Sequence, residues 1–168
     1  MTKIVGVIGS KGFVGSSIYR HIKLKKISIN RNNYLDLQKK KFDIAIHLAA
    51  QAGVRYSIIN PQKYLKVNIL GYLNLLKLLN KYKTKKILYA SSSSVYGDNV
   101  IGSVSEEYPT LPSTNYGKSK LNAEHYLTDY CDAHGVQFYI IRPPLIIGPN
   151  CPGNLNRLYS LVNLRIPI

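Results

Sequence analysis

The chain has 168 residues, of which 45% are hydrophobic, and a formal net charge of +15 at pH 7. These values suit a globular domain with its own core, and no apolar run approaches the roughly 20 residues of a membrane-spanning helix. The cysteines, Cys131 and Cys151, form neither a disulfide framework nor a zinc spacing. We therefore predict no metal site, no membrane association and a cytoplasmic protein with reduced thiols.

The positive charge is concentrated in lysine clusters at Lys23–Lys26, Lys39–Lys41 and Lys81–Lys86. A basic surface attracts polyanions, so nucleic acid is one hypothesis for a partner. The alternative is a composition in which lysine is simply the common solvated residue. We favour this alternative, because no recognition helix, finger or aromatic platform accompanies the charge.

Short apolar runs alternate with longer amphipathic stretches, an order that predicts a parallel sheet with crossover helices. Strands are predicted at Lys3–Ile8, Lys26–Asn30, Asp43–Leu48, Lys86–Ser91 and Val136–Arg142, with a further short segment at Tyr34–Leu37. Helices are predicted at Gly12–His21, Pro61–Lys81 and Asn115–His134, the last ending at Gly135. The pattern predicts one α/β domain, a doubly wound parallel sheet with helices on both faces.

A glycine-rich loop, GSKGFVG, follows the first predicted strand and has the spacing G-x-x-G-x-x-G. Between a strand and a helix, this pattern predicts dinucleotide binding, although a purely structural turn is the alternative. Gly9 permits the tight turn, Gly12 lets backbone N–H groups approach a pyrophosphate, and Gly15 lets the helix pack on the strand. The helix N-terminus adds partial positive charge. The residues expected in this site are Gly9, Lys11, Gly12, Phe13, Val14 and Gly15.

The end of the second predicted strand bears on which dinucleotide is bound. An NAD site commonly has an Asp or Glu there that accepts hydrogen bonds from the ribose. This chain has SINRNN, with Asn30 and Arg31. A guanidinium favours the 2′-phosphate of NADP(H), and Lys11 adds a second positive charge. We therefore favour NADP(H), with NAD(H) as the alternative if Arg31 is only a surface cation.

The segment ASSSSVYG (Ala90–Gly97) follows the predicted strand Lys86–Ser91, and YGKSK opens the last helix. Ligands of an open parallel sheet sit at the carboxyl ends of its strands, so a serine here points into that crevice. Tyr116 and Lys120 are four residues apart and share a helix face. A nearby ammonium lowers the pKa of a tyrosine. Together these side chains predict a site that moves a proton while a nicotinamide moves a hydride.

Seven segments, in this order, resemble the extended short-chain dehydrogenase/reductase family, in its branch of NAD-dependent epimerases and dehydratases that includes UDP-glucose 4-epimerases. The segments are GSKGFVG, LDL (Leu35–Leu37), HLAAQAGVRYS (His47–Ser57), VNILGYLNLL (Val67–Leu76), SSSSVYG, YGKSK and RPPLIIGP (Arg142–Pro149). They cover nearly the whole chain. The resemblance implies a Rossmann-type fold and a nucleotide-sugar substrate.

The resemblance also implies residue roles. Tyr116 would be the general acid/base, Lys120 would lower its pKa and hold the nicotinamide ribose, and Ser92 would be the catalytic serine. It adds to the cofactor site Asp36 and Leu37 at the adenine end, Leu48, Ala49 and Ala50 along the groove, Asn68 near it, and Pro143 and Pro144 beside the nicotinamide. Asn68 has an alternative role, in which it only ties backbone segments together.

Two departures from the family pattern affect the substrate. Leu145, in RPPL, stands where many 4-epimerases have an asparagine, and the segment after it looks closer to relatives that act on UDP-linked amino sugars. Family members also continue into a second domain. We therefore expect residues 1–148 to form the NAD(P)-binding domain and 149–168 to begin a truncated substrate-binding region. The chain alone is then expected to bind NADPH without converting a UDP-sugar.

The leading hypothesis is an NAD(P)-dependent epimerase or 4-keto reductase of UDP-hexoses or UDP-amino sugars. The alternative is a catalytically idle NADP-binding remnant or sensor module. The resemblance also implies a homodimer formed through the helices Pro61–Lys81 and Asn115–His134. In the first of these, apolar character extends beyond one core-facing stripe, at Tyr64, Leu65, Tyr72 and Leu79.

Overall fold

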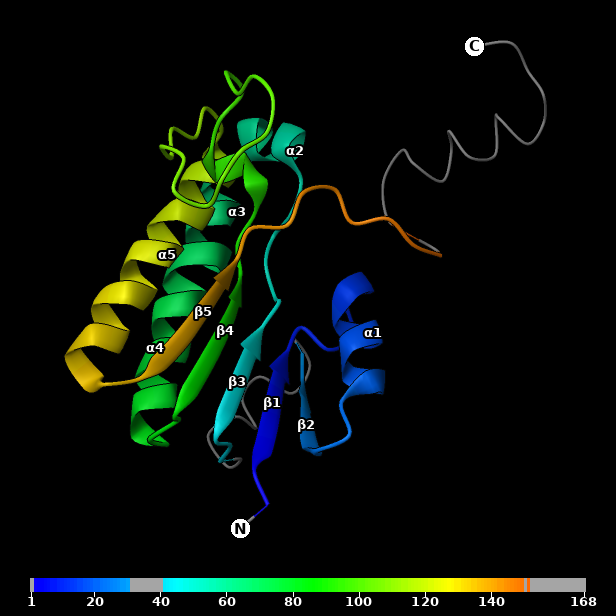
Figure 1. Cartoon of the computed structure of the whole chain (residues 1–168), viewed down its shortest axis with the longest axis vertical. Helices are drawn as coiled ribbons and strands as arrows, with labels where there is room; N and C mark the ends of the chain where they lie inside the picture. The colour runs from blue at the N-terminus through cyan, green and yellow to red at the C-terminus, as the bar shows by residue number, and fades with distance from the viewer. Residues whose placement is uncertain (1, 31–40, 150, 152–168) are drawn as a thin grey trace.

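The computed structural model describes residues 2–30, 41–149 and 151. Five parallel strands form one sheet in the order β2-β1-β3-β4-β5 (Figure 1). They are β1 (Ile4–Ile8), β2 (Lys25–Ile29), β3 (Ile44–His47), β4 (Lys86–Ala90) and β5 (Gln137–Ile141). The chain runs outward from β1 to β2 and then crosses back to β3, so the strand order reverses between β1 and β3. Such a reversal opens a crevice at the carboxyl edge of the sheet, where ligands of this class of fold bind.

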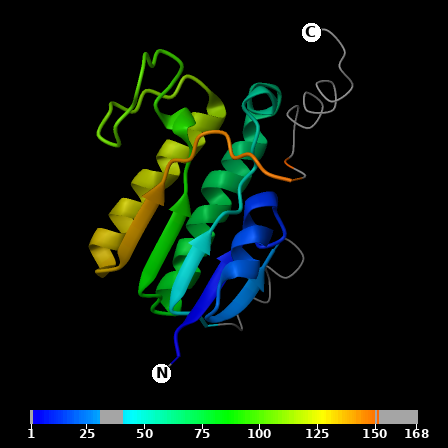
Figure 2. The ribbon, with the colours of Figure 1, turned by 45° about the vertical axis from the view of Figure 1, so that its right-hand side comes forward.

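Helices cover both faces of the sheet (Figure 2). Helix α1 (Phe13–His21) lies on one face, and α4 (Gly71–Lys81) and α5 (Asn115–His134) lie on the other (Figure 1). Two short helices, α2 (Val54–Ile59) and α3 (Pro61–Tyr64), lie towards the carboxyl end of the sheet. The doubly wound α/β prediction is therefore confirmed. Among the described helices, none combines the length and apolar character that spanning a membrane requires.

The core lies mainly between the sheet and the α4–α5 layer. It is formed by buried apolar side chains of the central strands and of these helices, including Ala45, Ile87, Tyr89, Leu75, Leu79 and Leu127. Strand β1 is buried along almost its whole length, as expected for a central parallel strand. Strand β5 alternates, with Tyr139 and Ile141 about half exposed.

Helix α5 begins and ends at the predicted residues. The Oγ1 of Thr114 accepts a hydrogen bond from the Gly117 N–H at 3.1 Å, which caps the first turn. Gly135 has a φ of 60° at the other end, the left-handed conformation that commonly terminates a helix. These two ends fix Tyr116 in the first turn of α5. Four of the predicted strands were one or two residues too long, and the strand predicted at Lys26–Asn30 was displaced by one residue. The segment Tyr34–Leu37 lies outside the described residues.

The predicted helix Pro61–Lys81 is interrupted. Between α3 and α4 the structure has a π-helical segment, η2 (Leu65–Leu70), in which Asn68 is buried. Such segments add a residue to a helical turn and are frequent at functional sites. Helix α2 was not predicted, and a short 3₁₀ turn, η3 (Ser93–Val95), follows the serines after β4. Both lie at the carboxyl edge of the sheet, beside the candidate site.

Candidate active site

The glycine loop joins β1 to α1 in a tight backbone turn. Gly9 has a φ of 94°, its N–H donates to the Ile29 carbonyl at 2.8 Å, and its own carbonyl accepts from the Gly12 N–H at 2.9 Å. A Cβ on Gly9 would lie 2.7 Å from the backbone N of Ala49, at the end of β3. The loop is therefore held between β2 and the segment after β3, which agrees with the turn expected at Gly9.

Close packing of α1 on this loop depends on Gly15. A Cβ there would lie 2.0 Å from the Gly9 carbonyl oxygen, a distance that backbone atoms cannot accommodate. Gly12, by contrast, is exposed, and its Cβ would meet only the Gly9 oxygen at 3.2 Å. The start of α1 carries no acidic residue in its first turn. An open glycine surface at a helix N-terminus without negative charge fits a dinucleotide pyrophosphate.

Three backbone positions expected along the cofactor groove lie directly after β3. The Leu48 N–H donates to the Ile8 carbonyl at 2.8 Å, so this segment continues alongside the end of β1. Leu48, Ala49 and Ala50 are each half-buried. These residues therefore border the glycine loop, and their place along a cofactor groove stays a prediction.

Asn68 connects this segment to α5. Its Oδ1 accepts from the Gln51 N–H at 2.7 Å, and its Nδ2 donates to the Gln51 carbonyl at 3.1 Å and to Ser119 Oγ at 3.0 Å. Asn68 is 4% exposed, so its side-chain amide makes these contacts in the interior of the protein. They agree with the structural alternative for Asn68, which ties two backbone segments at the edge of the site.

Ser92 lies after the carboxyl end of β4, and Tyr116 lies in the first turn of α5. The Ser92 hydroxyl accepts from the Ser94 N–H at 3.2 Å, which orients it at the start of η3. Burial raises the pKa of Tyr116, and a hydrogen bond with Ser92 lowers it. The two predicted catalytic hydroxyls are therefore neighbours. Burial is the larger of the two effects and keeps Tyr116 in its phenol form, and the lowering expected from Lys120 stays a prediction.

Lys120 is 3% exposed and reaches the same strand end. Its Nζ donates to the Ala90 carbonyl at 2.5 Å and lies 4.5 Å from the centre of the Tyr89 ring. Burial lowers its pKa to about 7, and the nearby Glu124 carboxylate opposes that shift. A buried lysine that titrates near neutrality is typical of functional sites.

A stack of aromatic rings underlies this lysine. The imidazole of His47 packs against Tyr72 and Tyr89, with ring centres 4.9 and 5.7 Å away. Burial, with Lys120 as the second cause, lowers the pKa of His47 to about 3. His47 is therefore neutral, and its Nδ1 has no hydrogen-bond partner among the described residues.

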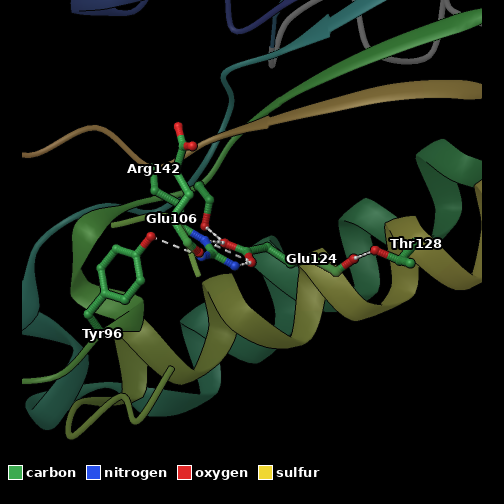
Figure 3. Close-up of polar contacts among 6 residues, drawn as sticks. Tyr96, Glu106, Glu124, Thr128 and Arg142 are labelled. Carbon is green, nitrogen blue, oxygen red and sulfur yellow. Dashed lines mark hydrogen bonds and ion pairs between the residues drawn. The ribbon is translucent and has the colours of Figure 1, made fainter. Parts of the chain in front are cut away.

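An ion pair that the sequence analysis did not predict joins α5 to the residue after β5 (Figure 3). Glu124, one turn further along α5, accepts from Arg142 Nη2 at 2.7 Å and from Arg142 Nε at 3.1 Å. The Ser91 hydroxyl donates to the same carboxylate. In the sequence, the signals for this ion pair were a glutamate four residues after Lys120 and an arginine at the end of the last predicted strand.

An open groove of about 1230 Å³ adjoins the site. It is lined by the segment after β4, by β5 and by the residues that follow it, including Ser93, Tyr96, Ile141, Arg142, Pro143 and Pro144. The groove therefore reaches the carboxyl end of β4 near Ser93 and Pro143, and it extends along β5, away from the glycine loop.

The predicted residues thus form two groups at the carboxyl edge of the sheet. The glycine loop and Leu48–Ala50 lie at the strand-order reversal, and Ser92, Tyr116 and Lys120 lie around the end of β4. Arg31, Asp36 and Leu37 lie outside the described residues.

A family model for the NAD dependent epimerase/dehydratase family matches residues 5–166. The chain belongs to this family. UDP-glucuronate 4-epimerase 1 of Arabidopsis thaliana is 32% identical over 181 aligned residues, which cover 85% of this chain and 42% of that protein. UDP-glucose 4-epimerase of Halalkalibacterium halodurans is 32% identical over 126 residues, 75% of this chain and 38% of that protein.

Solved structures of relatives have the same fold. UDP-glucose 4-epimerase of Thermus thermophilus in complex with NAD matches with a TM-score of 0.76 at 28% identity, over 83% of this chain and 54% of that one. RMD of Pseudomonas aeruginosa, complexed with NADPH, matches with a TM-score of 0.82 at 28% identity, over 97% and 61%. The chain spans about half the length, or less, of the curated relatives that it matches.

Proposed function

We propose that this chain carries the cofactor site and the proton-transfer groups of an NAD(P)-dependent enzyme that acts on a UDP-linked sugar. The proposed reaction is 4-epimerisation or reduction of a 4-keto group, on a UDP-hexose or a UDP-amino sugar. The observation that supports it most is the meeting of Ser92, Tyr116 and Lys120 at the end of β4 in a member of this family. A module that only bound a dinucleotide would not need this set.

The side chains suit proton transfer at a sugar carbonyl or hydroxyl. The nicotinamide, when bound, supplies hydride exchange with the substrate carbon. Burial holds Tyr116 as a phenol, the form that donates a proton to a carbonyl oxygen. Ser92 would hold that oxygen by a hydrogen bond. In the reverse direction, the Lys120 ammonium would favour the phenolate, which accepts the proton from a hydroxyl group.

NADP(H) is the proposed cofactor, with NAD(H) as the alternative. Relatives differ on this point, since the Thermus thermophilus structure contains NAD and the Pseudomonas aeruginosa structure contains NADPH. Arg31 and Lys11 support NADP(H) because both add positive charge where a 2′-phosphate would lie. In the same proposal, residues 1–148 are the cofactor domain and 149–168 begin the substrate-binding region.

We also propose a homodimer in the cytoplasm. Of the four apolar residues expected outside the core-facing stripe, Tyr64, Tyr72 and Leu79 are in fact buried in the core, and only Leu65 is exposed. The support for pairing is instead the exposed apolar surface of Leu65, Leu70 and Tyr126, on η2 and α5, at 53%, 51% and 40% exposure. Light scattering that gives twice the mass of the chain would support the dimer, and a monomer would contradict it.

The experiment that tests the catalytic assignment uses this chain followed by the remaining half of a relative, such as the Thermus thermophilus epimerase. Tyr116→Phe should lower turnover of a UDP-sugar by about 10²–10⁴-fold, the usual worth of general acid–base catalysis. NADPH binding, measured by calorimetry, should be unchanged. Lys120→Met should weaken both binding and turnover. Equal turnover in the Tyr116→Phe protein would refute the assignment.

A further inference from the structure

Glu124 is the only acidic side chain that is fully buried among the described residues, at 2% exposure. Its carboxylate receives the Arg142 guanidinium in a two-pronged contact, with Nη2 at 2.7 Å from Oε2 and Nε at 3.1 Å from Oε1. The Ser91 hydroxyl donates to Oε1 as well. A buried carboxylate is costly unless it is paired and hydrogen-bonded, so this position is stable only as part of the network (Figure 3).

Arg142 extends the network to the loop beside the groove. Its Nη1 donates to the Tyr96 hydroxyl and to the Glu106 carbonyl, both at 3.0 Å. The hydrogen bond with Glu124 raises the pKa of Arg142 further above its usual value, so the guanidinium is permanently charged. One residue at the end of β5 thus connects α5 to the segment that follows the catalytic serine.

The Glu124–Arg142 ion pair has no net charge, so the positive charge of Lys120 is not balanced by it. Lys120 and Glu124 are one helical turn apart on α5, and both are buried. Arg142 is in direct contact with the carboxylate. The Lys120 Nζ instead donates to the Ala90 carbonyl and is affected by the Glu124 charge without an ion pair. Burial favours the neutral form of Lys120, and the negative charge of Glu124 is what opposes it.

We propose that Glu124 is a positioning residue that keeps Lys120 charged, and that Arg142 limits how much of the Glu124 charge reaches Lys120. The charge on Lys120 is what the proposed function requires for holding the nicotinamide ribose and favouring the Tyr116 phenolate. The inference deepens that function and rests on it for its purpose, but its physical content concerns Lys120 alone.

The other groups that face Lys120 do not titrate near neutrality. They are Tyr89 on β4, His47 on β3 and Tyr72 on α4, whose rings pack together, and Tyr116, one helical turn earlier on α5. Burial raises the pKa of Tyr89 and of Tyr116 and lowers that of His47 to about 3. A transition observed at Lys120 near neutral pH therefore reports its own ionisation.

A competing explanation is that Glu124 and Arg142 only clamp the fold together. The two explanations differ in sign. If the charge is shared, Glu124→Gln lowers the pKa of Lys120, whereas Arg142→Gln raises it, because the carboxylate then acts on Lys120 alone. If the pair is only a clamp, either change loosens the site, admits water, and moves the pKa of Lys120 upward towards its ordinary value.

The experiment is an NMR titration of the lysine Cε resonances in the 168-residue protein without cofactor, between about pH 6 and about pH 10. The Lys120 signal is assigned by its loss in Lys120→Met. We expect shifts of about one pH unit, downward in Glu124→Gln and upward in Arg142→Gln. Asp129→Asn, which removes one charge from an exposed position on the same helix, should leave the midpoint unchanged. Shifts in one common direction, or no shifts, would overturn the proposal.

A second pair of variants covers the case in which Glu124→Gln does not fold. Arg142→Lys keeps the positive charge but loses the two-pronged contact. Shared charge predicts an upward shift in Arg142→Gln and little change in Arg142→Lys, whereas a loosened clamp predicts an upward shift in both. NADH affinity at each pH is measured in parallel. If the midpoints shift as expected but affinity does not follow them, the proposed role of Lys120 in cofactor binding fails, while the electrostatic role of Glu124 stands.

Discussion

At the carboxyl edge of the sheet, the β1–α1 side and the β4–α5–β5 side form their parts of the site from different kinds of groups. On the β1–α1 side, the site is formed by the backbone of the glycine loop, and positions such as Gly15 have no room for a side chain. On the β4–α5–β5 side, the site is made of side chains, with Lys120, Glu124 and Arg142 held in a partly buried network. A phosphate can be bound by N–H groups at a helix end, but proton transfer requires titratable groups at fixed positions.

This difference predicts different kinds of fragility. The glycine side should fail by steric exclusion, which is insensitive to pH. The stability and ligand binding of the β4–α5–β5 side should respond to pH and to changes of charge, because its buried ionisable groups are coupled.

Gly15→Ala should be the most damaging single change on the glycine side. The new Cβ would lie 2.0 Å from the Gly9 oxygen and 2.8 Å from the Gly9 carbonyl carbon, so α1 must move away from the loop. We expect a loss of about 2–4 kcal/mol in the free energy of unfolding, measured in urea, and no measurable NADH binding by calorimetry.

Gly12→Ala is the matched control for that change. Its Cβ has only one close neighbour, at 3.2 Å, and would lie on the exposed surface of the loop. The fold should therefore keep its stability while NADH binding weakens, because the methyl group would occupy space needed by the pyrophosphate. Equal stability of both variants would mean that the loop relaxes more easily than its geometry indicates.

Because of His47, the free energy of unfolding of the protein should depend on pH. Its pKa is about 3 in the folded chain and 6.5 when unfolded, so the unfolded chain binds more protons in between. The contribution is complete above about pH 6.5 and is lost as the pH falls towards 3, at up to about 1.4 kcal/mol per pH unit. From about pH 6.5 to about pH 5 the protein should lose about 2 kcal/mol.

His47→Phe should remove this dependence, because a phenyl ring can stack on Tyr72 and Tyr89 without titrating. Urea unfolding at several pH values measures the effect. Lys120 does not contribute in this range, since its pKa of about 7 leaves it protonated below that pH in both the folded and unfolded states. The same acid slope in the His47→Phe protein would mean that other groups cause it.

Arg31→Asp should change cofactor preference with little effect on the fold. The parent chain should bind NADPH more tightly than NADH, and the variant should reverse this, because an acid repels the 2′-phosphate and accepts hydrogen bonds from the ribose. A change of about tenfold in the affinity ratio corresponds to about 1.4 kcal/mol. Tighter binding of NADH by the parent chain would show that Arg31 does not select the cofactor.

Elements with a strong local signal were predicted well from the sequence. Helix α5 has a capping threonine before it and a glycine after it, and its predicted bounds, Asn115–His134, agree with the structure. The parallel sheet with crossover helices followed from the alternation of apolar runs. Because the strands are parallel, their carboxyl ends meet at one edge, and this brings Ser92 close to Tyr116 and Lys120.

What could not be predicted depends on tertiary contacts. A glutamate on a helix is ordinarily a solvated residue, and only the arrival of Arg142 from the end of β5 makes Glu124 a buried ion-pair partner. Helix α2 has six residues, and Ile58 and Ile59 are exposed at 67% and 80%, so it lacks an amphipathic pattern. The π-helical segment η2 shifts the apolar spacing by a single residue, which periodicity cannot resolve.

The smallest predicted effect concerns Gly71, where the π-helical segment gives way to α4. Its φ of −61° and ψ of −39° are ordinary helical values, and a Cβ there would meet only the Lys66 oxygen, at 3.5 Å. Unlike Gly15, this glycine has room for a methyl group. Gly71→Ala should therefore stabilise the chain by up to about 1 kcal/mol, chiefly by restricting the unfolded state. For a chain of this length, that corresponds to a rise of about 2–4 °C in Tm, measured by calorimetry at a fixed protein concentration. A fall in Tm would contradict this and would mean that a Cβ at residue 71 displaces a packed neighbour. A fall seen only where light scattering reports a dimer would identify that neighbour as the second protomer.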